Sequence, residues 1–320
     1  MGFALAASAG LSMSTQARIN GELAVRLGDG VAAAVISFGT GLALLAVLVP
    51  LFPAGRRGLR GVRDAVRTGP LRWWQCLGGV FGGFVVATQG LTVPALGVAV
   101  FTVAVVAGQS TSSLAVDRAG LGPASAERIT AARLVGAALC VLAVLVAVSD
   151  RLGTPRALGL AVLPLLAGVG VAWQLAVNGR VRAAAGSTWP ATLINFAVGF
   201  AALVLGFVIA VLVRGWPGGE LPAEPWLYVG GALGAYNIAV AAAVVRFTGV
   251  LLLGLAATAG QVVWALVLDL VAPTDGPPAA NTYAGAVLTL VAVGIAAAPR
   301  LRRRAAPPLP VPASVPADRG

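Results

Sequence analysis

Long apolar runs recur along this chain, separated by short segments that contain arginine, glycine and proline. Each run has about 20 residues, which is the length that a helix needs to cross a hydrocarbon core of roughly 30 Å. The pattern predicts spans near residues 3–25, 31–52, 73–93, 95–116, 129–149, 158–179, 189–213, 226–245, 249–271 and 281–298. We therefore expect an all-α integral membrane protein with ten transmembrane helices.

The first span contains polar residues at positions where lipid would make them costly. In LSMSTQARINGEL (11–23), Gln16 and Asn20 lie one turn apart on one helical face. The later segment VGVAWQLAVNGRV (169–181) repeats this pattern and aligns Gln174 and Asn178 with them. A cleaved signal peptide is not expected at the N-terminus, because a signal would not be repeated in mid-chain.

The similarity continues in order along the two halves of the chain. AVISFGTG (34–41) aligns with TLINFAVG (192–199), and Ser37 then stands opposite Asn195. WQCLGGVFGGF (74–84) aligns with WLYVGGALGAY (226–236), and GVAVFTVAVVAGQ (97–109) with GVLLLGLAATAGQ (249–261). We divide the chain into a first five-helix repeat (1–150), a second repeat (151–299) and a tail (300–320).

An odd number of spans in each repeat places the second repeat upside down in the membrane, as a 5+5 inverted-topology repeat. The arginines agree with this arrangement. Loops on the side of the N-terminus carry Arg56, Arg57, Arg60, Arg63, Arg67, Arg72, Arg118, Arg128, Arg133, Arg180, Arg182, Arg246, Arg300, Arg302, Arg303 and Arg304. Loops on the other side carry Arg26, Arg151, Arg156 and Arg214. The positive-inside rule then predicts a bacterial-type plasma (inner) membrane protein with both termini in the cytoplasm.

Composition narrows the chemistry. The 320 residues are 58% hydrophobic and only 10% charged, with a mean hydropathy of +0.92, whereas a soluble domain has about 25% charged residues. The net charge of +11 is explained by loop arginines, so no nucleic acid partner is expected. The chain has no histidine, and Cys76 and Cys140 stand alone within spans. We therefore expect no metal site, no cofactor and no hydrolase triad.

The Q-x-x-x-N-G segments, the S/N-F-x-x-G segments and the G-Q pairs near the end of the fourth span of each repeat resemble the YdcZ-type family of proposed inner-membrane exporters. This family belongs to the drug/metabolite transporter superfamily, and the chain resembles a fused double copy of it. The resemblance implies export. The family is similar to small multidrug resistance proteins, which are driven by a glutamate in the first span. Gln16 and Gln174 occupy the corresponding positions here, which puts proton-coupled cation export in doubt.

Six carboxamides are the predicted substrate-binding residues. They are Gln16, Asn20, Gln109, Gln174, Asn178 and Gln261. From their depth in the spans we expect one layer that pairs Gln16 with Gln261 and a second that pairs Gln174 with Gln109, both facing a cavity at the repeat interface. The alternative is that these amides only join helices through hydrogen bonds.

Three carboxylates are candidates for coupling transport to an ion. Glu22 lies at helical spacing from Arg18 and Arg26, and an ion-paired interfacial face is the simpler interpretation. Asp117 and Asp269 recur near the ends of equivalent spans. Local pairing or capping is the alternative for both of these residues.

Other segments have structural interpretations. Glycines at 78, 79, 82 and 83, echoed at 230, 231 and 234, favour close helix packing, with sliding of a mobile helix pair as the alternative. Segment 54–72 is interpreted as charge that fixes orientation, with an amphipathic interfacial helix as the alternative. The basic, proline-rich tail 300–320 is expected to be cytoplasmic and disordered.

These features favour a secondary transporter of a small polar or amphipathic metabolite or drug, and the family resemblance implies that it is an exporter. The two inverted repeats would work by alternating access in the lipid bilayer. Fusion of two units is consistent with a monomer. A non-transporting membrane scaffold or assembly protein is the alternative, and a closed interior would favour it. An intramembrane enzyme is not expected, because no paired acid and base stand out near one interface.

Overall fold

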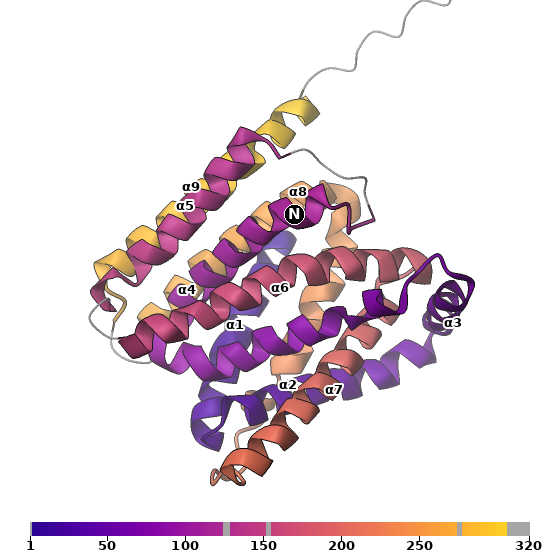
Figure 1. Cartoon of the computed structure of the whole chain (residues 1–320), viewed down its shortest axis with the longest axis horizontal. Coiled ribbons are helices and arrows are strands. Elements are labelled where there is room, and N and C mark those ends of the chain that lie inside the picture. The colour runs from indigo at the N-terminus through magenta and orange to yellow at the C-terminus, as the bar shows by residue number, and fades with distance from the viewer. Residues whose placement is uncertain (1, 124–128, 152–154, 274–276, 306–320) are drawn as a thin grey trace, which may run out of the picture.

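The computed structural model describes residues 2–123, 129–151, 155–273 and 277–305, and all regular structure within them is helical (Figure 1). The helices are α1 (Gly2–Leu27), α2 (Gly30–Leu51), α3 (Pro53–Thr68), α4 (Gly79–Arg118), α5 (Ala131–Ala147), α6 (Pro155–Ala185), α7 (Thr188–Arg214), α8 (Gly230–Val271) and α9 (Ala280–Ala305). The short 3-10 helices are η1 (Trp73–Gly78), η2 (Ser149–Arg151) and η3 (Pro225–Tyr228).

Six segments of the described residues are long and apolar enough to cross a membrane. They are Gly30–Leu51, Trp73–Arg118, Gly159–Ala185, Thr188–Arg214, Gly254–Val271 and Ala280–Ala298. This confirms the prediction of an all-helical chain with multiple membrane spans. Two predicted boundaries differ. The predicted span 129–149 corresponds to a shorter helix, α5. The basic residues at the start of the predicted tail belong to α9, which continues to Ala305. The rest of the tail lies outside the described residues.

Two helices are about twice as long as one crossing requires. α4 has 40 residues and α8 has 42, whereas a single crossing takes about 20. α4 is broken at Gly97, where φ is 82° and ψ is 166°. Only glycine adopts these angles readily, so the chain changes direction there without a separate loop. The break falls near the start of the predicted span 95–116, so the chain turns about two residues later than the predicted spans 73–93 and 95–116 imply.

The contacts of α4 with α6 show that the chain reverses. Before the break, Gly78 faces Asn178 and Gly82 faces Gln174, so this limb runs antiparallel to α6. After the break, Gly108 lies against Leu165, and the Arg180 guanidinium donates to Gly120 O and Leu121 O, so this limb runs parallel to α6. α4 is therefore a hairpin whose two limbs both contact α6.

α8 forms an equivalent hairpin around α1. Its first limb runs antiparallel to α1, because Gly230 faces Asn20 and Gly234 faces Gln16. Its second limb runs parallel to α1. Ser14 Oγ donates to Gln261 O at 2.7 Å, and Trp264 Nε1 donates to Thr15 Oγ1 at 2.9 Å. These contacts place the predicted spans 226–245 and 249–271 in the two limbs of α8.

The main helix pairs are equivalent in the two repeats. α1 packs along α8 as α6 packs along α4, while α2 packs with α7 and α5 with α9 (Figure 1). α5 and α9 run antiparallel, because Gly136, near the start of α5, meets Ala296, and Gly285, near the start of α9, meets Ala147. α5 and α9 are the last helices of the two repeats, so these equivalent helices run in opposite directions.

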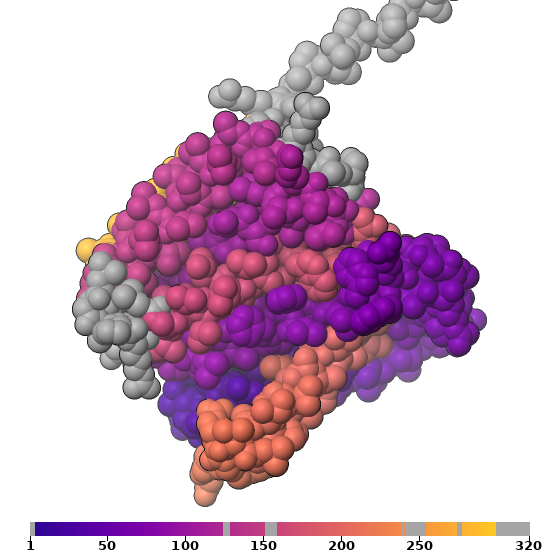
Figure 2. All heavy atoms as spheres, in the orientation of Figure 1, coloured from indigo at the N-terminus to yellow at the C-terminus, as the bar shows by residue number. Residues whose placement is uncertain are grey.

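Residues 53–68 of segment 54–72 form the helix α3. The segment is thus helical, as the alternative interpretation expected, and the role of its charge in orientation stays a prediction. Gly55, Gly58 and Val62 are buried on one face of α3, and Gly58 lies against Pro190 at the start of α7. The opposite face exposes Arg56, Arg57, Arg60, Arg63 and Arg67. Spacing of three and four residues puts these arginines on one side, and α3 covers one edge of the molecule (Figure 2).

Replacing Gly97 with alanine should destabilise the protein. A Cβ at this position would lie 2.8 Å from Asp269 Oδ2, and alanine would be held at an unfavourable φ. We expect a loss of about 1–3 kcal/mol in the free energy of unfolding, measured as thermal unfolding of the purified protein in detergent. Gly206→Ala in α7 is the control, because no atom lies within 4 Å of its Cβ position. Equal stability of the two variants would contradict the tight turn at Gly97.

Candidate functional site

Four polar side chains from α1, α2 and α4 gather against the first limb of α8. We call them the first polar cluster, which consists of Gln16, Asn20, Ser37 and Gln89. Asn20 Nδ2 donates to Gln89 Oε1 at 2.6 Å and so joins α1 to α4. Because Gly230 has no side chain, Asn20 and Ser37 can approach the backbone of α8 closely. A Cβ there would lie 2.6 Å from Asn20 Oδ1 and 2.8 Å from Ser37 Oγ.

The first polar cluster is sealed from the surface. The exposed fraction is 7% for Gln16, 0% for Asn20, 2% for Ser37 and 3% for Gln89. Among the described residues, Asn20 Oδ1 and Ser37 Oγ are buried without a hydrogen-bond partner. Such an atom costs about 1–3 kcal/mol of stability, so two of them side by side require an explanation.

A second polar cluster lies at the equivalent place in the other repeat and consists of Gln174, Asn178 and Asn195. Asn195 Oδ1 accepts two hydrogen bonds, from Gln174 Nε2 at 3.0 Å and from Asn178 Nδ2 at 2.8 Å. Gly78 and Gly82 provide the glycine surface on the first limb of α4. Gln174 and Asn178 are partly exposed, in contrast to their counterparts in the first polar cluster.

The crossing of α2 and α7 separates the two clusters. Phe38 and Phe196, which occupy equivalent positions in the repeats, stack with ring centroids 4.8 Å apart and an interplanar angle of 28°. Gly41 lies against the Phe196 ring and Gly199 against the Phe38 ring. The stack therefore lies at the centre of symmetry of the contacts between the two repeats.

The predicted pairing of Gln16 with Gln261 and of Gln174 with Gln109 is wrong. Gln16 faces Gly234, and Gln174 faces Gly82. The reason is that α1 and α6 each contact both limbs of a hairpin. The second limb meets them through its backbone, as the bond from Ser14 to Gln261 O shows. The assignment of Gln109 and Gln261 as substrate-binding residues stays a prediction, and both side chains are partly buried.

Two members of the clusters, Ser37 and Asn195, were not among the predicted site residues. Ser37 and Asn195 align in the repeat, and this alignment was the signal that could have identified them. Gln89 has no polar counterpart, since Ala241 aligns with it, and its presence in one repeat only makes it a sequence candidate for substrate selectivity. Its contact with Asn20 places it in the first polar cluster.

The carboxylates predicted as coupling candidates all have local partners. Glu22 pairs with Arg26 at 3.2 Å, in agreement with the interfacial ion-pair interpretation. Asp117 pairs with Arg133. Asp269 Oδ1 accepts from Val98 N–H at 2.9 Å, and its Oδ2 accepts from Ala99 N–H at 2.7 Å. Their role in coupling stays a prediction.

Asp269 has a structural task at the break in α4. Its carboxylate, 6% exposed, caps the first free N–H groups of the limb that starts after Gly97. A negative charge is favourable at a helix N-terminus because it opposes the positive end of the helix dipole. The cap from α8 thus holds the hairpin turn of α4.

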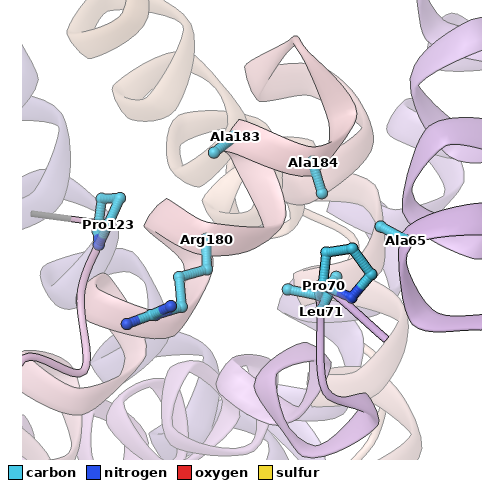
Figure 3. A pocket seen from close by; sticks show the side chains of 7 residues that line it. All are labelled: Ala65, Pro70, Leu71, Pro123, Arg180, Ala183 and Ala184. Atoms are coloured by element: carbon cyan, nitrogen blue, oxygen red, sulfur yellow. The ribbon is translucent and has the colours of Figure 1, made fainter. Parts of the chain in front are cut away.

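A pocket of about 300 Å³ lies between α3, the segment before η1 and the C-terminal end of α6 (Figure 3). Its lining is Ala65, Pro70, Leu71, Pro123, Arg180, Ala183 and Ala184. Arg180 extends toward Pro123 in this pocket, and its guanidinium is bound to the carbonyls at the end of α4. The pocket does not include any member of the two polar clusters, so it is separate from the predicted site.

The fold and the paired polar clusters define a multi-pass membrane protein built from an internal repeat. The model of the family described as "Putative inner membrane exporter, YdcZ" matches residues 1–146 and again residues 159–295. The chain therefore belongs to this family, in a form that contains two copies of the family unit. The family is not one of enzymes. A search among curated proteins gave no match.

Replacing Asp269 should loosen the turn of α4. Asp269→Ala removes both bonds to the backbone, and we expect a loss of about 0.5–2 kcal/mol in the free energy of unfolding. Asp269→Asn keeps a side-chain acceptor and should lose less. Thermal unfolding of the purified variants measures both effects. A normal thermal midpoint in Asp269→Ala would show that the cap does not stabilise the fold.

Proposed function

We propose that this protein is a secondary transporter that exports a small polar or amphipathic metabolite or drug by alternating access. Membership of a family described as exporters supports export. Equivalent helices that run antiparallel support a 5+5 inverted repeat, as found in many secondary transporters. In this proposal the two hairpins, α4 and α8, each cross the membrane twice, which gives ten crossings.

One observation carries the proposal. Two equivalent polar clusters, built on equivalent helices, differ in exposure: the first is sealed, while Gln174 and Asn178 of the second are partly exposed. Alternating access requires equivalent sites in the two repeats to differ in exposure in any one state. In the state open to the opposite side of the membrane, the exposed cluster becomes sealed and the sealed cluster becomes exposed. A symmetric scaffold has no need of this difference.

The contacts between the halves suit a rocking motion. α2 and α7 meet through stacked Phe38 and Phe196 and through glycines that present only backbone. Flat contacts of this kind allow one helix to rotate against the other without separating interdigitated side chains. The Phe38 and Phe196 stack would serve as the pivot between the two states.

Orientation follows from charge. The exposed arginines of α3 lie on the side of the N-terminus, whereas the segment before η3 in the other repeat carries Glu220 and Glu224. The side with the arginines is the cytoplasmic side in this proposal, with both termini there. Both polar clusters are complete within one chain, so one chain is the transporting unit.

The alternative function is a membrane scaffold. It is supported by the closed interior around the first polar cluster. It is also supported by the hydrogen bonds that Asn195 accepts from Gln174 and Asn178, because these bonds join α6 to α7 without any ligand. The two functions predict different results when one amide is removed from each repeat: a transporter should lose export, whereas a scaffold should not.

Removal of one amide from each repeat tests the proposed function. Metabolites inside and outside cells are compared for cells that lack the protein, cells that overproduce it and cells that overproduce Gln16→Ala/Gln174→Ala at matched membrane abundance. We expect at least one compound to move outward with the wild type and about tenfold less with the variant, which corresponds to roughly 1.4 kcal/mol of lost binding. Identical profiles from both proteins would favour the scaffold.

Cysteine labelling tests the orientation. In a background without Cys76 and Cys140, Arg63→Cys in α3 and Glu220→Cys before η3 provide exposed thiols. A membrane-impermeant maleimide should label position 220 in intact cells and position 63 only after the membrane is opened. Labelling of both positions from outside would refute the proposed topology.

A further inference from the structure

We infer that the first polar cluster is the subsite that recognises the substrate, and that it takes a neutral hydroxyl or primary amide group. The inference rests on the proposed function and deepens it. The second polar cluster, in contrast, is occupied by its own side chains.

Hydrogen-bond accounting separates the two clusters. In the second, the Asn195 carbonyl satisfies both amide donors that face the glycine surface of α4. In the first, the equivalent residue is Ser37, whose side chain is too short to bridge its neighbours. Its hydroxyl makes no hydrogen bond among the described residues.

The remaining groups of the first polar cluster are left open in the same way. Asn20 Nδ2 is taken by Gln89, but Asn20 Oδ1 has no partner. The Gln16 amide lies against the same helix, with its Nε2 3.3 Å and its Oε1 3.5 Å from the Cβ position of Gly234. Gly230 and Gly234 are one turn apart, so the open groups line a single strip of α8 about 5–6 Å long.

The chemistry of the open groups defines the ligand. Asn20 Oδ1 accepts only, the Gln16 amide offers a donor and an acceptor, and the Ser37 hydroxyl does both. A hydroxyl or a primary amide can donate to Asn20 while it accepts from Gln16 or Ser37. All members of the cluster are uncharged. An ionised group buried there would lose its hydration without gaining a counter-charge.

Glycine on the facing helix is required for this recognition. Any side chain at 230 would collide with the two open oxygens, since a Cβ there already comes within 2.6 Å and 2.8 Å of them. The same glycine surface in the second repeat is closed by Asn195. The exchange of serine for asparagine between repeats thus distinguishes a site for ligand from a site for packing.

A double variant converts the first cluster into the second. Ser37→Asn supplies the bridging carbonyl, and Gln89→Ala introduces the residue that aligns with position 89 in the second repeat. The new carbonyl should satisfy the donors of Gln16 and Asn20, so the thermal midpoint of the purified protein should rise by about 2–4 °C. Asn195→Ser is the matched variant and should lower the midpoint by a similar amount, because it opens the second cluster.

Transport is measured for the same variants by the comparison of cell metabolites. We expect the compounds moved by the wild type to carry a neutral hydroxyl or primary amide. Their export should fall at least about tenfold in Ser37→Asn/Gln89→Ala and stay near the wild-type rate in Gly206→Ala, because no atom lies within 4 Å of that Cβ position in α7. Ser37→Ala, a smaller change, should also reduce export if the double variant does not fold.

The outcomes separate this inference from the proposed function. Normal export by the double variant with a raised thermal midpoint would overturn the subsite and leave the transporter intact. Wild-type export only of compounds without a neutral hydroxyl or amide would overturn the ligand class. If the wild type moves nothing, the proposed function fails, and the subsite fails with it. A midpoint that does not rise in the double variant would refute the open network itself.

Discussion

Direct contact between backbones at glycine holds the two repeats together. α1 lies between the two limbs of α8, where a Cβ at Gly10 would collide with the Ala257 carbonyl. α6 lies between the limbs of α4, where Gly168 meets the Val105 carbonyl in the same way. Lipid provides no hydrophobic force between helices, so this close van der Waals contact supplies the attraction. Each repeat therefore encloses a helix of the other, and the repeats interlock.

This interlocking places equivalent polar residues on equivalent surfaces. A helix that contacts a glycine strip along one face can carry amides there, because the strip leaves room for them. The same helix arrangement therefore produces a polar cluster in each repeat. The two clusters differ because Ser37 in the first stands where Asn195 stands in the second. A fused repeat can differ in this way, whereas a homodimer of identical chains could not differ at a single position.

Three of the charged residues lie around these clusters at turns and helix ends. Asp269 caps the α4 limb after Gly97, Arg180 binds the carbonyls at the other end of that limb, and Glu22 pairs with Arg26. Each of these charges stabilises a helix end or another charge. The interior clusters themselves contain only neutral groups, which fits a solute recognised through hydrogen bonds.

The sequence by itself determined the helical membrane class, the repeat and the positions of most spans, because apolar runs of fixed length and aligned motifs are local properties of the chain. It also showed that Gln16, Asn20, Gln174 and Asn178 form a polar pattern repeated in the two halves. The tertiary structure decided their partners. Gln16 lies against Gly234 instead of pairing with Gln261, and Gln89 joins Asn20 across two helices. Such contacts depend on the direction of each limb after a turn, and a turn at one glycine leaves no periodic signal in the sequence.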